Sequence, residues 1–203
     1  MASAWTPVGL SRDLPGLAVM PASVEGQDLA VWRSASGRVA AWDDRCPHRG
    51  MRLSHGFVRG EALSCIYHGW SYGAEGNCLR IPAHPDLVPP EAIRVPVHRA
   101  LEADGVIWVA LRPTEETPPS VTGQPLRSVT VDAVVDLAVA GFAVSGAVAT
   151  GRISDVSVTI LSQPLPGGRT ALHVLASAEG PSALIEVSRG IEDLRRQAEG
   201  AFA

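Results

Sequence analysis

Two short segments of the sequence each contain one cysteine and one histidine at a spacing that suits metal binding. Cys46 and His48 lie in the first segment, and Cys65 and His68 lie in the second, after a gap of sixteen residues. Thiolate sulfur and imidazole nitrogen bind both zinc and iron–sulfur clusters. Each segment also has a glycine one or two residues after its histidine, which permits a backbone turn close to a bound group. The pattern therefore predicts a metal centre held between two loops.

Two kinds of centre use two cysteines and two histidines. In a Rieske-type [2Fe-2S] cluster, two thiolates bind one iron and two imidazoles bind the other, so each loop supplies one ligand to each iron. A structural zinc site is the alternative, but zinc fingers usually pair cysteine with cysteine and histidine with histidine. The order here alternates. We therefore predict a Rieske [2Fe-2S] cluster with Cys46, His48, Cys65 and His68 as its ligands, rather than zinc or four unliganded core residues.

Three residues beside these ligands, Arg49, Tyr67 and Trp70, are expected to surround the cluster without binding it. Arg49 is placed to stabilise the reduced cluster electrostatically, and Trp70 follows the second ligand histidine closely enough to lie beside the cluster. Two ferric ions, two sulfides, two thiolates and two neutral imidazoles carry no net charge. A neutral cluster accepts an electron more easily than one with four thiolates.

Composition limits the other functions of the chain. Its 203 residues carry a net charge of −4 and include no basic stripe, so we expect no nucleic-acid partner. No apolar run approaches the ~20 residues of a membrane helix, and the first residues do not resemble a secretory signal. We therefore expect a cytoplasmic protein without a membrane partner. Three cysteines in that compartment favour metal or redox chemistry over disulfides, and we interpret Cys78 as a small buried residue.

Short β-strands are predicted on both sides of the two motifs. Apolar and polar residues alternate before and after Ser36-Gly37, which indicates a hairpin. Residues 101–111 indicate a second hairpin, with its turn at Ala103-Asp104-Gly105. We expect a small all-β domain over residues 1–112.

The proline-rich segment PTEETPPSVTGQP, residues 113–125, is the clearest linker in the chain. Strand patterns return after it, and apolar residues then recur at helical spacing from Ser182 to Glu199. Ser182 is the expected N-cap of this helix. Residues 126–203 are therefore predicted to form a small α+β domain.

The segment CPHRGMRLSHGFVRGEALSCIYHGWSYGAEGNCLRIPAHP resembles the N-terminal Rieske domain of the Rieske non-haem iron oxygenases, which include aromatic ring hydroxylases and demethylases. The resemblance covers about residues 5–112 and implies a mainly β fold, a Rieske-type antiparallel β-sandwich with the cluster at the tip of two loops. Respiratory Rieske proteins match less well, because they have serine where this chain has Trp70. Without that hydrogen-bond donor, we expect a reduction potential of roughly −150 mV, near the low end of the Rieske range.

Oxygenases of this family continue into a longer domain that binds a mononuclear ferrous ion with two histidines and one carboxylate. The other four histidines here lack the family's paired spacing, and we interpret them as surface or structural residues: His55, His84, His98 and His173. No catalytic residue is predicted. Residues 153–177 and the last helix resemble the end of that domain, which implies a chain with a truncated catalytic domain.

The resemblance implies an electron-transfer protein or subunit of a multicomponent oxygenase. It would take single electrons from a reductase or ferredoxin and deliver them to an oxygenase centre on a partner chain, within an oligomer. Two alternatives remain open. The chain could be a complete small oxygenase with an unrecognised iron site that uses His98, His173 and a carboxylate, or a non-catalytic regulatory subunit that keeps the cluster for stability or redox sensing.

Overall fold

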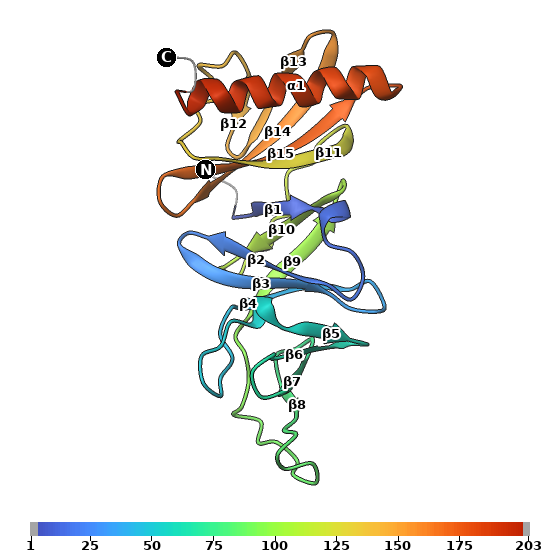
Figure 1. Cartoon of the computed structure of the whole chain (residues 1–203), viewed down its shortest axis with the longest axis vertical. Coiled ribbons are helices and arrows are strands. Elements are labelled where there is room, and N and C mark those ends of the chain that lie inside the picture. Colours follow the sequence, from blue (N-terminus) through green and yellow to red (C-terminus); the bar gives the residue numbers. More distant parts are fainter. Residues whose placement is uncertain (1–3, 201–203) are drawn as a thin grey trace. The chain divides into compact units, whose positions relative to one another are not determined.

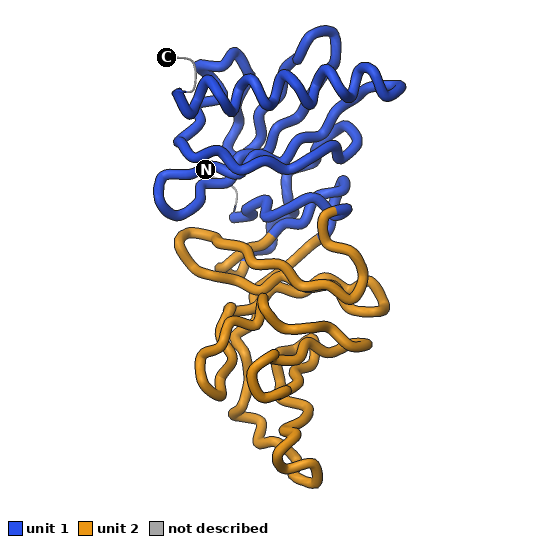
Figure 2. Tube along the Cα trace, in the orientation of Figure 1, with its two compact units in different colours: residues 1–12, 102–108, 114–203 blue, residues 13–101, 109–113 orange. Residues whose placement is uncertain are grey.

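The computed structural model describes residues 4–200, which form two compact units (Figure 2). Unit 1 comprises the chain up to residue 12, residues 102–108, and the chain from residue 114 onward, and unit 2 comprises residues 13–101 and 109–113. Within unit 1, the residue Arg12 and the tip of a hairpin bond to the proline-rich segment 113–125. The Arg12 side chain donates to the Pro125 carbonyl (3.0 Å), and the Val121 N–H donates to Asp104 (2.9 Å).

Unit 2 consists of short antiparallel strands, and the chain as a whole is mainly β, as predicted (Figure 1). The strands are β2 (Val19–Val24), β3 (Gln27–Arg33), β4 (Val39–Asp43), β5 (Phe57–Arg59), β6 (Ala62–Ser64), β7 (Ser71–Gly73) and β8 (Cys78–Arg80). Two short 3-10 helices, η1 (Ser11–Asp13) and η2 (Leu53–His55), connect strands.

The strands belong to two sheets. The larger has the order β1-β10-β9-β4-β3-β2, with β1 (Thr6–Leu10), β9 (Val97–Ala103) and β10 (Val106–Ala110), and the smaller has the order β5-β6-β7-β8. Both predicted hairpins are present. The first joins β3 to β4. The second joins β9 to β10, and its turn residues Asp104 and Gly105 have φ values of 51° and 75°, as a tight hairpin turn requires.

The core of unit 2 packs residues of the larger sheet against residues of the smaller sheet. Trp42 on β4 lies with its ring centroid 4.9 Å from that of Trp32 and 6.4 Å from that of Tyr72 on β7. Cys46 and Cys65 belong to the same buried cluster. The hydrophobic core therefore anchors the first residue of each predicted metal-binding loop.

The C-terminal part of unit 1 is a five-stranded antiparallel sheet with one long helix along it (Figure 1). The strand order is β11-β15-β14-β13-β12, and the elements are β11 (Gln124–Val131), β12 (Ala143–Ser145), β13 (Val148–Ile153), β14 (Val156–Leu165), β15 (Arg169–Ser177) and α1 (Pro181–Ala198). Val187 and Ile191 of the helix are fully buried in one cluster with Ile160 and Leu172 of the sheet. No helix among residues 4–200 has both the length and the apolar character that a membrane crossing requires.

The predicted N-cap of the helix was wrong. The cap is Gly180, with a φ of 88°, and Pro181 takes the first helical turn, so Ser182 already lies inside the helix. Proline fits this position because its missing N–H would have no partner there. Gly200 follows the helix end, as predicted.

Candidate metal centre

The first predicted metal-binding segment forms a closed loop after β4, which we call the first ligand loop (Cys46–Met51). The Cys46 N–H donates to the Met51 carbonyl (2.8 Å), and the Gly50 N–H donates to the Cys46 carbonyl (2.8 Å). Gly50 has a φ of 70°, a left-handed conformation that glycine adopts without strain. His48 lies at the top of this loop, two residues after the cysteine.

The second ligand loop (Cys65–Trp70) joins β6 to β7 and repeats the same hydrogen bonds. The Cys65 N–H donates to the Trp70 carbonyl (2.9 Å), and the Gly69 N–H donates to the Cys65 carbonyl (3.0 Å). Gly69 has a φ of 71°. The two loops therefore have equivalent backbones, but His68 comes three residues after its cysteine, one position later than in the first ligand loop.

The two cysteine side chains belong to the same core cluster of unit 2, and both are buried. Burial raises the pKa of the Cys65 thiol and the nearby Cys46 raises it further, whereas hydrogen bonds from the Tyr67 and His68 N–H groups lower it. A thiolate here needs a cation, which a bound metal supplies, and the two N–H groups add the hydrogen bonds that an iron–sulfur site uses.

The two histidine rings also lie together, with centroids 4.6 Å apart. Trp70 stacks on His48 at 4.4 Å and an interplanar angle of 5°, and Tyr67 lies 3.8 Å from His68 by ring centroids. Burial lowers the pKa of His48, and positive charge on His68 and Arg49 lowers it further. The neutral imidazole is the form that binds a metal.

Among the four predicted ligands, the two cysteines are thus buried in one core cluster and the two imidazole rings lie side by side. Among residues 4–200, no three His, Cys, Asp or Glu side chains are grouped as ligands of a single ion. A two-iron cluster needs one pair of ligands for each iron, and the donor set fits that requirement.

Tyr72, on β7, is a neighbour of the site that the sequence did not reveal. Its hydroxyl lies 3.1 Å from the Cys46 sulfur, and its side chain is fully buried. Burial raises the pKa of Tyr72, so the phenol stays protonated and can donate to a metal-bound thiolate. The predicted reduction potential took account only of the serine donor that Trp70 replaces. No spacing in the sequence indicated that a tyrosine on β7 would supply another hydrogen-bond donor.

The remaining predicted residues lie in ordinary surroundings. His55 and His84 are exposed, and Cys78 is buried in the core of unit 2. His98 Nε2 lies 2.7 Å from an Asp43 carboxylate oxygen in unit 2.

His173 is buried in unit 1, where Nδ1 lies 2.9 Å from the Ser128 hydroxyl and Nε2 lies 3.4 Å from the Gln163 side-chain oxygen. Both ring nitrogens of His173 therefore have polar partners from its own sheet.

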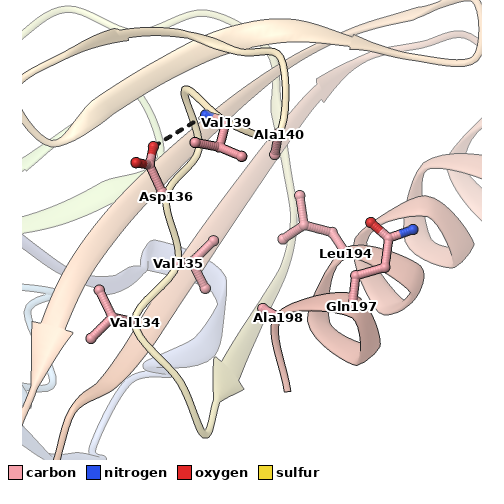
Figure 3. A pocket seen from close by; sticks show the side chains of 8 residues that line it. All are labelled: Val134, Val135, Asp136, Val139, Ala140, Leu194, Gln197 and Ala198. Atoms are coloured by element: carbon pink, nitrogen blue, oxygen red, sulfur yellow. Dashed lines mark hydrogen bonds between the residues drawn. The ribbon is translucent and has the colours of Figure 1, made fainter. Parts of the chain in front are cut away.

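A separate hollow of about 280 Å³ lies between residues 134–140 and the end of α1 (Figure 3). It is mostly apolar, and Val134 and Val139 are 78% and 85% exposed. Its carboxylate, on Asp136, accepts hydrogen bonds from the backbone N–H groups of Ala138 and Val139. The hollow is therefore open to solvent and offers a ligand little enclosed polar surface.

Comparison with known families matches residues 4–98 to the Rieske [2Fe-2S] domain. This segment is a Rieske domain. The family resemblance predicted from the two motifs is thereby confirmed, and so is the Rieske-type [2Fe-2S] cluster as its cofactor.

The curated relatives of the chain include an oxidoreductase and an oxygenase subunit. The chain is 41% identical over 142 residues to the oxidoreductase NdmD of Pseudomonas putida, an alignment that covers 65% of this chain and 24% of NdmD. It is 37% identical over 107 residues to the oxygenase subunit of 3-chlorobenzoate-3,4-dioxygenase of Comamonas testosteroni, covering 52% of this chain and 25% of that subunit. The chain thus spans about a quarter of the length of these relatives.

Solved structures resemble nearly the whole chain in fold. Apo dicamba monooxygenase aligns with a TM-score of 0.76 at 16% identity, covering 97% of this chain and 85% of that chain. NdmA of Pseudomonas putida CBB5 aligns with a TM-score of 0.73 at 20% identity, covering 96% and 78%. At such identities the likeness concerns the fold alone, and it extends past the Rieske domain into the helix-covered sheet.

Proposed function

We propose that Cys46, His48, Cys65 and His68 are the cluster ligands, and that the chain carries single electrons from a reductase or ferredoxin to an oxygenase centre on another chain. One observation carries the proposal: the two cysteines are buried in one core cluster, and the two imidazole rings lie with their centroids 4.6 Å apart. The bound cluster would accept and release one electron at a time.

The difference in exposure between the cysteine pair and the histidine pair indicates the side of the cluster at which electrons would be exchanged. The cysteines are buried, whereas His68 is exposed and His48 is half-buried. A redox partner can therefore approach the imidazole pair more closely than the sulfur pair. Trp70 and Tyr67 restrict the two rings by contact, which keeps their metal-binding nitrogens oriented.

The contacts of the other histidines favour electron transfer over a complete small oxygenase. His98 is engaged by Asp43, and His173 is engaged by Ser128 and Gln163. The oxygen-activating iron is therefore assigned to a partner chain. The proposal includes an oligomer with that partner and a cytoplasmic location, both of which rest on the family resemblance.

Anaerobic stopped-flow spectroscopy tests the function. The purified protein is mixed with NADH and a flavin-dependent reductase, and then with cytochrome c as acceptor. We expect rapid bleaching of the visible absorption, its return on addition of cytochrome c, and two irons per chain. Three irons per chain with oxygen consumption would instead indicate a complete oxygenase. A chain with a full cluster that the reductase cannot reduce would contradict the proposal and favour the regulatory alternative.

A further inference from the structure

The two ligand loops have equivalent backbones but differ at their bases. The second ligand loop is the tip of a hairpin, because β6 and β7 pair from Ala62 and Gly73 up to Ser64 and Ser71. A backbone ladder therefore closes this loop directly below its cysteine.

The first ligand loop has no such ladder in the described part of the chain. Strand β4, which leads into it, pairs with β3 and β9, and the residues after the loop enter the 3-10 helix η2. The bond from the Cys46 N–H to the Met51 carbonyl closes the loop itself, but no strand pair continues below that bond. The segments on either side of the loop must therefore be held together in another way if its cysteine and histidine are to keep their places.

Asp44 and Ser54 provide that junction. Asp44 is only 1% exposed and lies two residues before the first ligand. One of its carboxylate oxygens accepts a hydrogen bond from the Ser54 N–H and the other from the Ser54 hydroxyl, both at 2.6 Å. Ser54 belongs to η2, so these bonds connect the segment just before the loop to the 3-10 helix just after it.

Arg52 adds an electrostatic link at the same place. One of its guanidinium nitrogens lies 3.4 Å from the Asp44 carboxylate, and another lies 2.7 Å from Asp28. Hydrogen bonds to a charged acceptor are stronger than neutral ones, and a buried carboxylate that loses its donors is costly. Both facts favour a fixed geometry at the base of the loop.

We propose that Asp44 is a positioning residue that closes the first ligand loop through Ser54 and thereby controls how firmly the chain retains its cluster. The inference rests on the ligand assignment proposed above. The loop supplies one cysteine and one histidine, which bind different irons in a Rieske cluster. Opening its base therefore loosens one ligand of each iron, while the hairpin keeps the other two in place.

Four substitutions test this role. Ser54→Ala removes one hydrogen bond to the carboxylate, and Asp44→Ala removes both. Asp44→Asn can keep both contacts, because its oxygen accepts from the Ser54 N–H and its amide donates to the hydroxyl. Ser64→Ala is the matched control, since it removes a 2.8 Å hydroxyl contact with Ser71 at the base of the other loop, where the ladder remains.

Three measurements are compared across these variants. The first is the rate at which visible absorption disappears when the folded protein is challenged with an iron chelator. The second is the electron paramagnetic resonance spectrum of the dithionite-reduced protein, and the third is the melting temperature of the cluster-free protein.

We expect Ser54→Ala to lose its cluster about tenfold faster than the parent, as the loss of one charge-assisted hydrogen bond implies. Asp44→Ala should be faster still, with a broadened resonance spectrum because two ligands take more than one geometry. Asp44→Asn keeps both contacts but loses the charge, so its rate should lie between those of the parent and Asp44→Ala, whereas Ser64→Ala should stay within about twofold of the parent.

The proposal is overturned if Ser54→Ala and Ser64→Ala release the cluster at the same rate, or if faster release in each variant simply follows a lower melting temperature without any spectral change. If Asp44→Ala does not fold, the comparison of Ser54→Ala with Ser64→Ala decides the question. These measurements need no redox partner, so they can fail or succeed independently of the electron-transfer function.

Discussion

The aromatic residues of the second ligand loop contact both ligand histidines. Trp70 reaches across to stack on His48 of the other loop, and Tyr67 covers His68 of its own loop. One loop thus orients both imidazoles. Tyr67 and Trp70 were predicted only as neighbours of the cluster, and they make close ring contacts with the two histidines.

Loss of a single ligand should remove the cluster. We expect Cys46→Ser and His68→Ala to abolish the visible absorption and the resonance signal of the reduced protein, because each leaves one iron with an incomplete ligand set. His84→Ala, at an exposed histidine, is the control and should retain both signals. Full signals in either ligand variant would reject the ligand assignment.

Loss of the Tyr72 hydroxyl should lower the reduction potential. A hydrogen bond to a cysteine ligand withdraws charge from the sulfur, so its removal makes the cluster harder to reduce. A net bond of about 1 kcal/mol corresponds to about 40 mV for a one-electron couple, the expected drop in Tyr72→Phe. Redox titration of this variant measures the change. Tyr67→Phe, which keeps its ring on His68, should not shift the potential, and an equal shift in both variants would argue against the hydrogen bond.

Two motifs in the sequence indicate the four proposed ligands, whereas no motif indicates the residues that support them. The ligands stand in two short patterns with glycine beside them. Tyr72 reaches Cys46 across 26 residues, and Ser54 reaches Asp44 across ten, through contacts that only the paired strands and the helix η2 create. Tyrosine, serine and aspartate are common residues, and nothing in their spacing distinguishes these three from others.

At the scale of elements, charged residues at the end of α1 join the helix to the segment that follows β11. Arg195 forms ion pairs with Glu192 and Glu199, and Glu199 also accepts a hydrogen bond from the Asp132 N–H (2.9 Å). The Arg195 hydrogen bond lowers the pKa of Glu192, and the Asp132 N–H lowers the pKa of Glu199. Both carboxylates thus stabilise the folded state in their ionised form.

Acid should therefore weaken this junction. Because the folded-state pKa lies below that of the unfolded chain, the stabilisation is present above the ordinary glutamate pKa of about 4.3 and is lost as the pH falls through the lowered folded value. We expect the melting temperature of the parent to fall over this range, and Glu199→Gln to show a smaller fall. Glu186→Gln, at an exposed position of the same helix, should behave like the parent. Identical pH profiles for Glu199→Gln and the parent would contradict this interpretation.

Strand patterns predicted some elements of the sheet in unit 1 better than others. The sequences of β14 and β15 are typical of strands, because apolar residues alternate or run together over ten and nine residues. β13 is harder to predict because it contains Gly151, where a side chain would collide with the Phe142 ring at 2.6 Å. A glycine that makes room for a ring appears in the sequence as a strand breaker.

At the scale of the whole molecule, all four proposed ligands belong to unit 2. Removal of the cluster should therefore loosen this unit selectively. Hydrogen exchange followed by mass spectrometry should show faster exchange across residues 44–72 in the cluster-free protein, because the metal no longer ties the two loops together.

In the same hydrogen-exchange experiment, the exchange rates of β14 and β15 serve as an internal reference. β14 and β15 are held by a nine-residue antiparallel register and should exchange at unchanged rates. Equal acceleration in both regions would mean that the cluster stabilises the chain globally, and that the two units do not unfold separately.

The last residue of unit 2 in the sequence is Pro113. A ribosome builds the chain from its N-terminus, so this iron-binding part is synthesised before the final helix, Pro181–Ala198, is translated. A ribosome stalled near the end of the C-terminal sheet would already hold a chain that contains all four proposed ligands.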